Sequence, residues 1–522
     1  MYIYLTSNSL LSDNQSGYRP NDSCINQLIS ITSEIFEAFE GYDEVRAVFL
    51  DISKAFDKVW YEGLLFKLER CGIEGNLLNL IKNYLHNRKQ RVVLNGQESG
   101  WETLYSGVPQ GSVLGPLLFL VYINDLTDNI SSNIKLFADD SSLFVRVRDA
   151  IVSHNQIVED LNTITKWAHQ WKMRFNPDIT KQAIEIIFSK KRASIEHPSL
   201  AFNGIPVARE PSTKHLGVIL DSKLSFREHI NQQIIKGKKG LALMKFLSKS
   251  VSSSVLELTY KMYVRPHLDY GDLIYHNQSA CMMDKLESIQ YQAALVVSGC
   301  WKGTNKVKLV KELGWETLSE RREFRRLVLY YKILHNMTPG YMRHHIKPVN
   351  ETATIRYKNS FFPFCMEKWE SLSAVIKNAV SISRFKNLYK GAYFPLKRSF
   401  FSTKDGWGKK CLFRLRVNFS DLKAHRFKHR FNCDSPECNC DTGEESTEHY
   451  LILCPLFSVQ RRNLLNDLTA ILIEGDGIPQ GTRLVSLILY GDHKFNDAKN
   501  KLILDLTIKY ILETKRFKST PR

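Results

Sequence analysis

The amino-acid sequence predicts an α+β fold, in which helices cover a sheet of mixed strands. Runs of Val, Ile, Leu and Phe with the length of buried strands recur along the N-terminal half. Longer segments with apolar residues at helical spacing lie between them, and one pair of strands is joined by a short polar turn instead. Strands that alternate with helices and include one hairpin favour a split βαβ sheet of the ferredoxin-like type.

The first elements follow from their apolar patterns. VRAVFLDI (45–52) predicts a buried strand that ends at Asp51, and GLLFKLERC (63–71) and NLLNLIKNYL (76–85) predict two helices. The segments RKQRVVLNG and SGWETLYS then resemble a hairpin whose polar turn is Asn95-Gly96.

A second strand–helix series follows. SVLGPLLFLVYINDL (112–126) predicts a helix that must be buried, despite its internal Gly and Pro. IKLFADDSSLFVRV (134–147) predicts strand, turn and strand, and residues 152–175 predict a helix. IEIIF (184–188) and LGVILD (216–221) predict two further strands. The apolar side of the helix 152–175 carries Leu161, Ile164, Trp167, Ala168 and Trp171.

Beyond Asp221 the strand signals fade, and the chain divides by composition. Residues 223–345 look helical and include the basic patches KGKKG and RREFRR, whereas residues 346–430 are mixed and basic. A Cys/His segment spans 431–456, and a helical tail covers 457–522. With residues 1–222 as the α+β part, the sequence therefore predicts five regions.

Charge and composition limit the class of protein. Lys and Arg number 72 against 54 Asp and Glu, a formal charge of +18, which favours a polyanionic partner such as nucleic acid. The N-terminus lacks the pattern of a signal peptide, and the most apolar stretch, PLLFLVYI, is too short to cross a membrane. We therefore expect an intracellular protein that is not secreted and has no membrane partner, with its 10 cysteines reduced or bound to metal.

Three polar segments carry the candidate chemistry. FLDISKAFDKVW ends a strand with Asp51, SGVPQGSVLGP is a Gly/Pro/Gln loop, and LFADDSSLF puts Asp139 and Asp140 at a hairpin turn. An ordinary polar turn would also explain the paired aspartates. Together with Asp51, however, the pair would form a carboxylate cluster that binds two Mg²⁺ ions for phosphoryl transfer, and this explanation is the better one. Because neighbouring strand residues point to opposite faces, Asp139 is expected to be the main ligand beside Asp51, with Asp140 secondary.

In this order, the three segments resemble motifs A, B and C of a reverse transcriptase, more narrowly of a jockey-like (LINE-type) non-LTR retrotransposon. GYRPNDSC, FNPDITKQAIEIIFSKK and KHLGVILD are similar to its upstream fingers motif, motif D and the strand that follows. VRPHLDYGDLIY, LESIQYQAALVVSG and LVKELGWETL are similar to its post-palm region. The resemblance implies a right-hand polymerase palm with partial fingers, a helical thumb and a small C-terminal zinc knuckle.

The resemblance also assigns roles to individual residues. It makes Asp51, Asp139 and Asp140 the catalytic metal ligands. Phe56 would be the steric gate that excludes a ribose 2′-OH. The remaining nucleotide- and template-binding residues would be Gln110 and Gly111 near the templating base pair, Arg19 at the triphosphate or the template, and Lys181 at the incoming phosphates. A core aromatic, a helix-entry turn and surface cations are the structural alternatives for these positions.

The Cys/His segment predicts a structural zinc site. Its pattern is Cys438-x-Cys440-x8-His449-x4-Cys454, and three thiolates with one imidazole suit tetrahedral Zn²⁺. The Cys-x-Cys spacing is tighter than usual, so Cys433 could replace one of the pair. Unrelated buried thiols are the alternative, and the basic residues just upstream would let a knuckle hold RNA phosphates.

These expectations define an RNA-directed DNA polymerase that extends a DNA primer on an RNA template with dNTPs, two Mg²⁺ ions and a structural Zn²⁺. By the habit of the family it would act in the nucleus. Nothing upstream resembles the family's endonuclease, and the chain starts within the fingers, so an N-terminally truncated copy is expected. A catalytically inactive remnant that only binds RNA is the alternative, and a metal-dependent nuclease is a weaker one, since a nuclease needs no sugar filter.

Overall fold

The computed structural model describes residues 1–176, 178, 182–191, 195–275, 278–394, 406–472 and 477–517. The chain forms two compact units. The sheet unit consists of Met1–His229, Gly271–Gln278 and Arg326–Leu372, and the helical unit consists of Ile230–Tyr270, Ser279–Arg325 and Ser373–Arg522. These limits differ from the ranges that composition suggested, because residues 326–372 return to the sheet unit.

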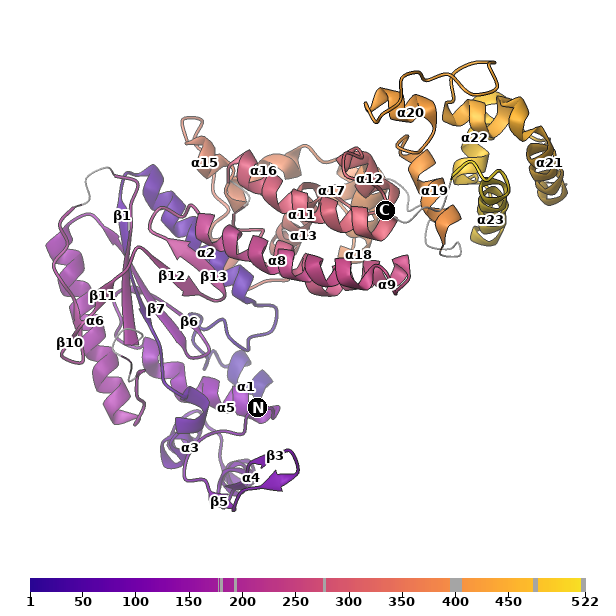
Figure 1. The fold of residues 1–522 in the computed structure, drawn as a ribbon. Helices are drawn as coiled ribbons and strands as arrows, with labels where there is room; N and C mark the ends of the chain where they lie inside the picture. The colour runs from indigo at the N-terminus through magenta and orange to yellow at the C-terminus, as the bar shows by residue number, and fades with distance from the viewer. Residues whose placement is uncertain are drawn as a thin grey trace. The chain divides into compact units, whose positions relative to one another are not determined.

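A five-stranded sheet lies at the centre of the sheet unit (Figure 1). Its strand order is β11-β8-β1-β7-β6, and every neighbouring pair is antiparallel except β11 with β8. The chain passes from β1 through helices to β6 and β7, then through one helix to β8. This succession and order are those of a split βαβ sheet. The strands are β1 (Glu44–Leu50), β6 (Asn133–Phe137), β7 (Asp140–Val147), β8 (Ala183–Phe188) and β11 (Ala208–Arg209).

Helices complete the core of the sheet unit. The strongly apolar α5 is buried along most of its length, as its sequence predicts. The predicted apolar side of α6 is buried as well, but α6 ends at Gln170 and not at Phe175. It ends there because Lys172 has a left-handed φ of 55° and Phe175 pairs with Ile52 in an antiparallel bridge. The helices are α1 (Tyr2–Ser7), α2 (Cys24–Glu40), α3 (Tyr61–Arg70), α4 (Gly75–Leu85), α5 (Leu114–Ile123) and α6 (Ala150–Gln170).

Four small two-stranded sheets accompany the main sheet. In one of them, Leu94 pairs with Gln97 around Asn95 and Gly96, whose φ values are 51° and 79°. Two left-handed residues in a two-residue loop are typical of a type I′ hairpin, as the Asn-Gly pair predicts. The strands are β2 (Lys89–Gln90), β3 (Val93–Leu94), β4 (Gln97–Glu98), β5 (Glu102–Thr103), β9 (Ala201–Phe202), β10 (Ile205–Pro206), β12 (Ser212–His215) and β13 (Val218–Asp221).

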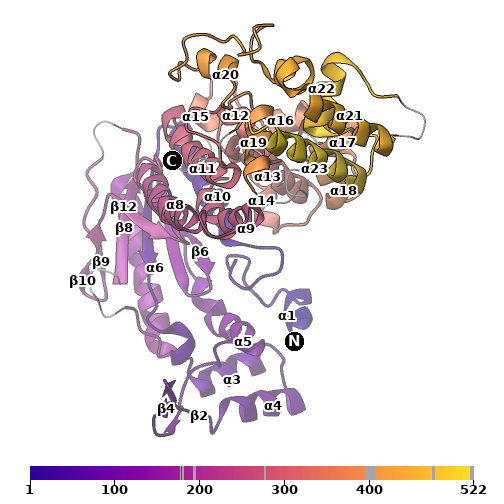
Figure 2. The same cartoon turned by 45° about the vertical axis from the view of Figure 1, so that its right-hand side comes forward.

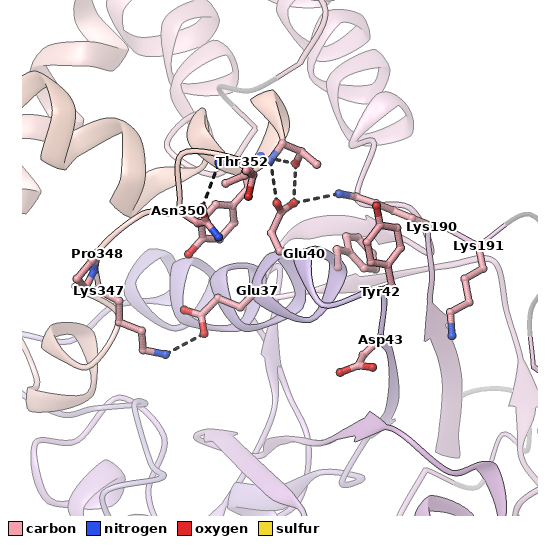
Figure 3. Close-up of a pocket in the computed structure, with 14 residues that line it drawn as sticks. Glu37, Glu40, Tyr42, Asp43, Lys190, Lys191, Lys347, Pro348, Asn350 and Thr352 are labelled. Carbon is pink, nitrogen blue, oxygen red and sulfur yellow. Dashed lines mark hydrogen bonds and ion pairs between the residues drawn. The ribbon is translucent and has the colours of Figure 1, made fainter.

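Residues 326–372 pack along α2. Lys347 pairs with Glu37 at 2.9 Å, and Thr354 donates hydrogen bonds to Glu40 through its backbone N–H (2.8 Å) and its hydroxyl (2.5 Å). Figure 3 shows these contacts around a cavity of about 680 Å³ beside the C-terminal end of α2. Polar bonds to a helix thus fix the returning segment, which contains α14 (Gly340–Arg343), α15 (Ile355–Lys358) and α16 (Phe361–Glu370).

The helical unit has no strand among its described residues. Its C-terminal part has a core of its own, in which α19, α21 and α22 each contact α23 (Figure 2). The helices that lie wholly or mainly in this unit are α8 (Arg227–Leu247), α9 (Ser253–Thr259), α10 (Arg265–Asp269), α11 (Ala280–Ser298), α12 (Lys306–Glu312), α17 (Ala374–Lys377), α18 (Ile382–Tyr393), α19 (Trp407–Arg416), α20 (Lys423–Lys428), α21 (Ser458–Leu472), α22 (Gly481–Tyr490) and α23 (Asp497–Glu513). Helix α13 (Leu318–Leu334) is divided between the two units, because the helical unit includes it only as far as Arg325.

No helix within the described ranges has both the length and the apolarity that a bilayer-crossing segment needs.

Candidate active site

Asp51 lies where β1 ends, and a second segment holds it in place. The backbone N–H of Asn176 donates to the Asp51 carbonyl at 2.9 Å, and its side-chain amide donates to the Asp51 carboxylate at 2.7 Å. Between these two segments, Ile52 and Phe175 form an antiparallel bridge and are both buried. The buried bridge fixes the backbone, and the Asn176 amide fixes the direction of the carboxylate.

The paired aspartates occupy the hairpin between β6 and β7. Phe137 pairs with Asp140, so Ala138 and Asp139 form the two-residue turn, with Ala138 at a φ of 55°. In the neighbouring ladder, Leu50 of β1 pairs with Ser141 of β7. Since the next residue outward on each strand is an aspartate, Asp51 and the hairpin pair are brought to the same end of the sheet.

The three carboxyl groups interact electrostatically. Burial, together with the charges of Asp139 and Asp51, raises the pKa of Asp140 to about 6. Burial also raises the pKa of Asp139. A hydrogen bond from its own backbone N–H lowers this pKa in part, and the negative charge of Asp51 raises it. Like charges that repel in partly desolvated surroundings are suited to hold a divalent cation. The three carboxylates are not, however, close enough to form a compact metal-ligand group. Among the described residues, the one group of at least three Cys, His, Asp or Glu side chains with such closely spaced ligand atoms is the Cys/His group of the helical unit.

The Gly/Pro/Gln loop packs on the turn that follows Asp51. Val108 N–H donates to the Phe56 carbonyl, and Gln110 donates to the Asp57 carboxylate at 3.0 Å. Gly107 needs its lack of a side chain, since a Cβ there would lie 2.8 Å from the Asp57 carbonyl oxygen. Gly111 has open space around it but a φ of 80°, so its backbone conformation alone explains the glycine.

Phe56 and Arg19 have different surroundings. The Phe56 ring stacks on Phe119 with centroids 4.5 Å apart and meets Tyr18 edge-on at 5.9 Å. Arg19 is half-buried, and its Nη1 is buried with no hydrogen-bond partner among the described residues. Lys181, the fifth predicted binding residue, lies outside the described residues.

Sequence reasoning missed a group of cations beside Asp51. The backbone carbonyl of Arg174 accepts a hydrogen bond from Ser53 N–H at 2.9 Å, which places Arg174 beside the segment that follows Asp51. Burial lowers the pKa of Lys58, and the nearby charges of Arg174 and Lys54 lower it further, so the three cations lie close together. None of them forms an ion pair with a described carboxylate. The signal that could have revealed them is the pairing of residues 51–53 with 174–176, which no local pattern predicts.

The predicted zinc ligands converge in the helical unit. One ligand atom from each of Cys438, Cys440, His449 and Cys454 lies within 4.8 Å of the others. Cys440 lies 3.1 Å from His449 Nε2, and Cys438 lies 3.7 Å from Cys454. Cys433 instead donates to the carbonyls of Lys423 and Ser435, so the structure excludes it from the group.

The thiols of this group differ in acidity. Burial raises the pKa of Cys438 to about 12 and raises that of Cys454 as well. At Cys440 burial acts to raise the pKa, but hydrogen bonds with Thr442, Cys438 and His449 outweigh it and lower the pKa to about 6. A bound cation would displace the protons of the two buried thiols, so the donor set fits a thiophilic metal such as Zn²⁺.

Comparison with known protein families identifies the class of the N-terminal domain. Residues 2–220 match the family described as "Reverse transcriptase (RNA-dependent DNA polymerase)", and this range contains all three aspartates. The chain therefore carries a reverse transcriptase domain of that family.

More narrowly, this domain is similar to the polymerases of jockey-like, non-LTR retrotransposons. From Drosophila melanogaster, the "RNA-directed DNA polymerase from mobile element jockey" is 29% identical over 298 residues, or 55% of this chain and 32% of the relative. The "Probable RNA-directed DNA polymerase from transposon BS" is 26% identical over 61% of this chain and 36% of the relative. The chain spans about a third of the length of these relatives.

This chain also matches a solved structure of telomerase from Candida albicans in complex with a fragment of telomeric RNA. The match covers 67% of this chain and 58% of the telomerase chain. Its TM-score of 0.30 and identity of 12% are too low to carry an argument.

Proposed function

We propose that the sheet unit is the palm and partial fingers of an RNA-directed DNA polymerase, which adds dNTPs to a DNA 3′-OH on an RNA template. The main support for this proposal is that Asp51, Asp139 and Asp140 lie at the same end of the paired strands β1 and β7. All three residues belong to the segment that matches the reverse transcriptase family. The helices that follow the palm would act as the thumb.

Asp51, Asp139 and Asp140 are the proposed ligands for two Mg²⁺ ions. Reverse transcriptases use divalent ions, which when bound activate the attacking oxygen and neutralise charge on the leaving phosphate. The raised pKa values of Asp139 and Asp140 support this role, because burial and the neighbouring charges both raise them and a bound cation would offset both effects. Asn176 would orient the Asp51 carboxylate throughout the reaction.

The cations near Asp51 are proposed to bind the triphosphate of the incoming nucleotide. Arg174, Lys54 and Lys58 repel one another and have no described carboxylate partner, which favours an anionic ligand. The unpaired Nη1 of Arg19 supports a phosphate contact for that residue too. Phe56, held against Phe119, would present its ring to the sugar and exclude a 2′-OH.

The Cys/His group is proposed to bind one structural Zn²⁺ through Cys438, Cys440, His449 and Cys454. Its role would be to hold the segment after α20 in a fixed conformation. The basic residues of α20 would then contact the phosphates of RNA.

Primer extension tests the main proposal. The purified chain, an RNA template with an annealed DNA primer, Mg²⁺ and the four dNTPs should give extended DNA, and Asp139→Ala should give none. Replacement of the exposed Asp13 by Asn is the matched control and should leave extension unchanged. Binding of RNA without extension under Mg²⁺ or Mn²⁺, or equal extension by Asp139→Ala, would contradict the proposal.

A further inference from the structure

The segment that precedes α2 runs beside the strand of the catalytic hairpin. Gln15 and Leu136 form a parallel bridge, Ser16 N–H donates to the Leu136 carbonyl, and Leu136 N–H donates to the Asn14 carbonyl, both at 2.9 Å. Since β6 is the edge strand of the sheet, residues 14–16 cover its open side. The hairpin is thus bonded on both sides, to β1 through β7 and to this segment through β6.

The Gln15 side chain bonds to the turn itself. It is 5% exposed, and its amide oxygen accepts from the N–H groups of Ala138 (2.8 Å) and Gly17 (2.7 Å). Its amide nitrogen donates to the Ala138 carbonyl at 3.2 Å. One buried amide therefore satisfies both backbone polar groups of Ala138, the residue directly before Asp139.

The Ala138 backbone needs such support. Its φ of 55° is a left-handed conformation that alanine adopts only when surrounding contacts hold it. Gly17 allows the close approach, because a Cβ there would lie 2.2 Å from Ala138 N. Tyr341 braces the far side of the segment by donating to Asp22 at 2.7 Å. The turn is thus held by side chains distant from it in sequence.

We infer that Gln15 is a positioning residue of the polymerase reaction: its buried amide fixes the Ala138–Asp139 turn and so fixes Asp139 in the metal-binding set. Gln15 contacts no reacting group and acts only through the turn. The inference rests on the proposed function, since it assigns Asp139 to metal binding. Residues that orient metal ligands typically change metal affinity or activity by about 10- to 100-fold when replaced.

Gln15→Met tests the inference, because it keeps the volume and removes all three hydrogen bonds. Gln27→Met is the matched control. Gln27 is also buried, and it donates to the carbonyl of Leu136 on β6 at 2.9 Å but forms no hydrogen bond with the turn. Both variants should lose stability, whereas only Gln15→Met should perturb Asp139.

The first readout is Mn²⁺ binding to the full chain by electron paramagnetic resonance, with Asp139→Asn as the blank. We expect Gln15→Met to bind Mn²⁺ about tenfold more weakly than the unsubstituted chain and Gln27→Met to bind it equally well. The second readout is the Mg²⁺ concentration at half-maximal primer extension, which should rise in Gln15→Met alone, with an unchanged KM for dNTP. Binding does not require turnover, so failure of the polymerase proposal and failure of this inference give different results.

Gln15→Glu provides a second variant should Gln15→Met not fold. A protonated Glu can both accept from Ala138 N–H and donate to its carbonyl, whereas the ionised form cannot donate. Its Mn²⁺ affinity relative to the unsubstituted chain should therefore fall as the pH rises. Unchanged affinity in a folded Gln15→Met, equal losses in Gln15→Met and Gln27→Met, or a pH-independent ratio for Gln15→Glu would each overturn the inference.

Discussion

At the scale of single residues, the site gathers charges that oppose folding. Asp139 and Asp140 are kept next to Asp51 although burial and mutual repulsion raise their pKa values. The charges of Lys54 and Arg174 likewise repel that of Lys58 and, with burial as the larger cause, lower its pKa. Strain of this kind is explained by ligands of opposite charge, which would be a divalent cation for the carboxylates and a phosphate for the cations.

Asp140→Asn should stabilise the chain in the absence of divalent ions. The substitution removes a charge that two neighbours repel. We expect the free energy of unfolding to rise by at most about 1 kcal/mol, because Asp140 is surrounded by protein on one side but keeps enough contact with solvent for its charge to be screened. Urea denaturation without added Mg²⁺ measures the effect, with Asp13→Asn as the control. A loss of stability in Asp140→Asn would contradict the repulsion.

Arg174→Ala should weaken nucleotide binding. If Arg174 holds a phosphate beside Asp51, its loss should raise the KM for dNTP about tenfold, the equivalent of one charge-assisted hydrogen bond. Steady-state primer extension measures KM, and Arg148→Ala, which removes an exposed cation at the far end of β7, is the control. Equal KM values in both variants would remove Arg174 from the proposed triphosphate site.

At the scale of elements, buried polar contacts fix helices against one another. Lys67 of α3 donates to the Tyr122 carbonyl of α5, pairs with Asp125 and lies 3.7 Å from the centre of the Trp171 ring. Burial lowers the pKa of Lys67 to about 8, although Asp125 raises it. The ammonium group is thus retained at a cost to stability that depends on pH.

The contribution of Lys67 to stability should increase with pH. The unfolded chain keeps the Lys67 proton up to about pH 10.4, and the folded chain loses it near 8. Between these values the unfolded state binds more protons, so the stability of the natural chain relative to Lys67→Met should rise, by at most about 3 kcal/mol. Urea titrations at pH 7.5, 8.5 and 9.5 measure it, and a flat or falling difference would refute the assignment.

The Cys/His segment should bind one zinc ion. We expect Cys438→Ser to lose the ion and to become sensitive to proteolysis around residues 431–456, because a structural zinc ion supplies folding energy to a short segment. Cys433→Ser should keep the ion, since Cys433 lies outside the ligand group. The zinc content of the two purified variants, measured by metal analysis, tests this prediction. Equal zinc content in both variants would refute the proposed ligand set.

At the scale of the whole molecule, the charge of +18 should govern binding to nucleic acid. If RNA contacts several cations, its affinity should fall by at least about tenfold between 50 and 200 mM salt, with a linear log–log slope. Fluorescence anisotropy with a labelled RNA measures this slope. A salt-independent affinity would show that the basic surface plays no part in binding.

By itself, the sequence determined most strands of the main sheet, most helices, and the places of the three aspartates and of the Cys/His group. Its apolar periodicity places Asp51 at the end of β1 and the Asp139–Asp140 pair at a hairpin, because local patterns encode local structure. The Cys/His spacing indicates the ligand group in the same way, except that it left Cys433 open.

Only the tertiary structure decided which distant segments support these side chains. Gln15 bonds to Ala138, Asn176 bonds to Asp51, and residues 326–372 return to α2, although each is remote in sequence from its partner. Polar contacts of this kind depend on where the chain crosses itself, and hydrophobic periodicity carries no information about such crossings.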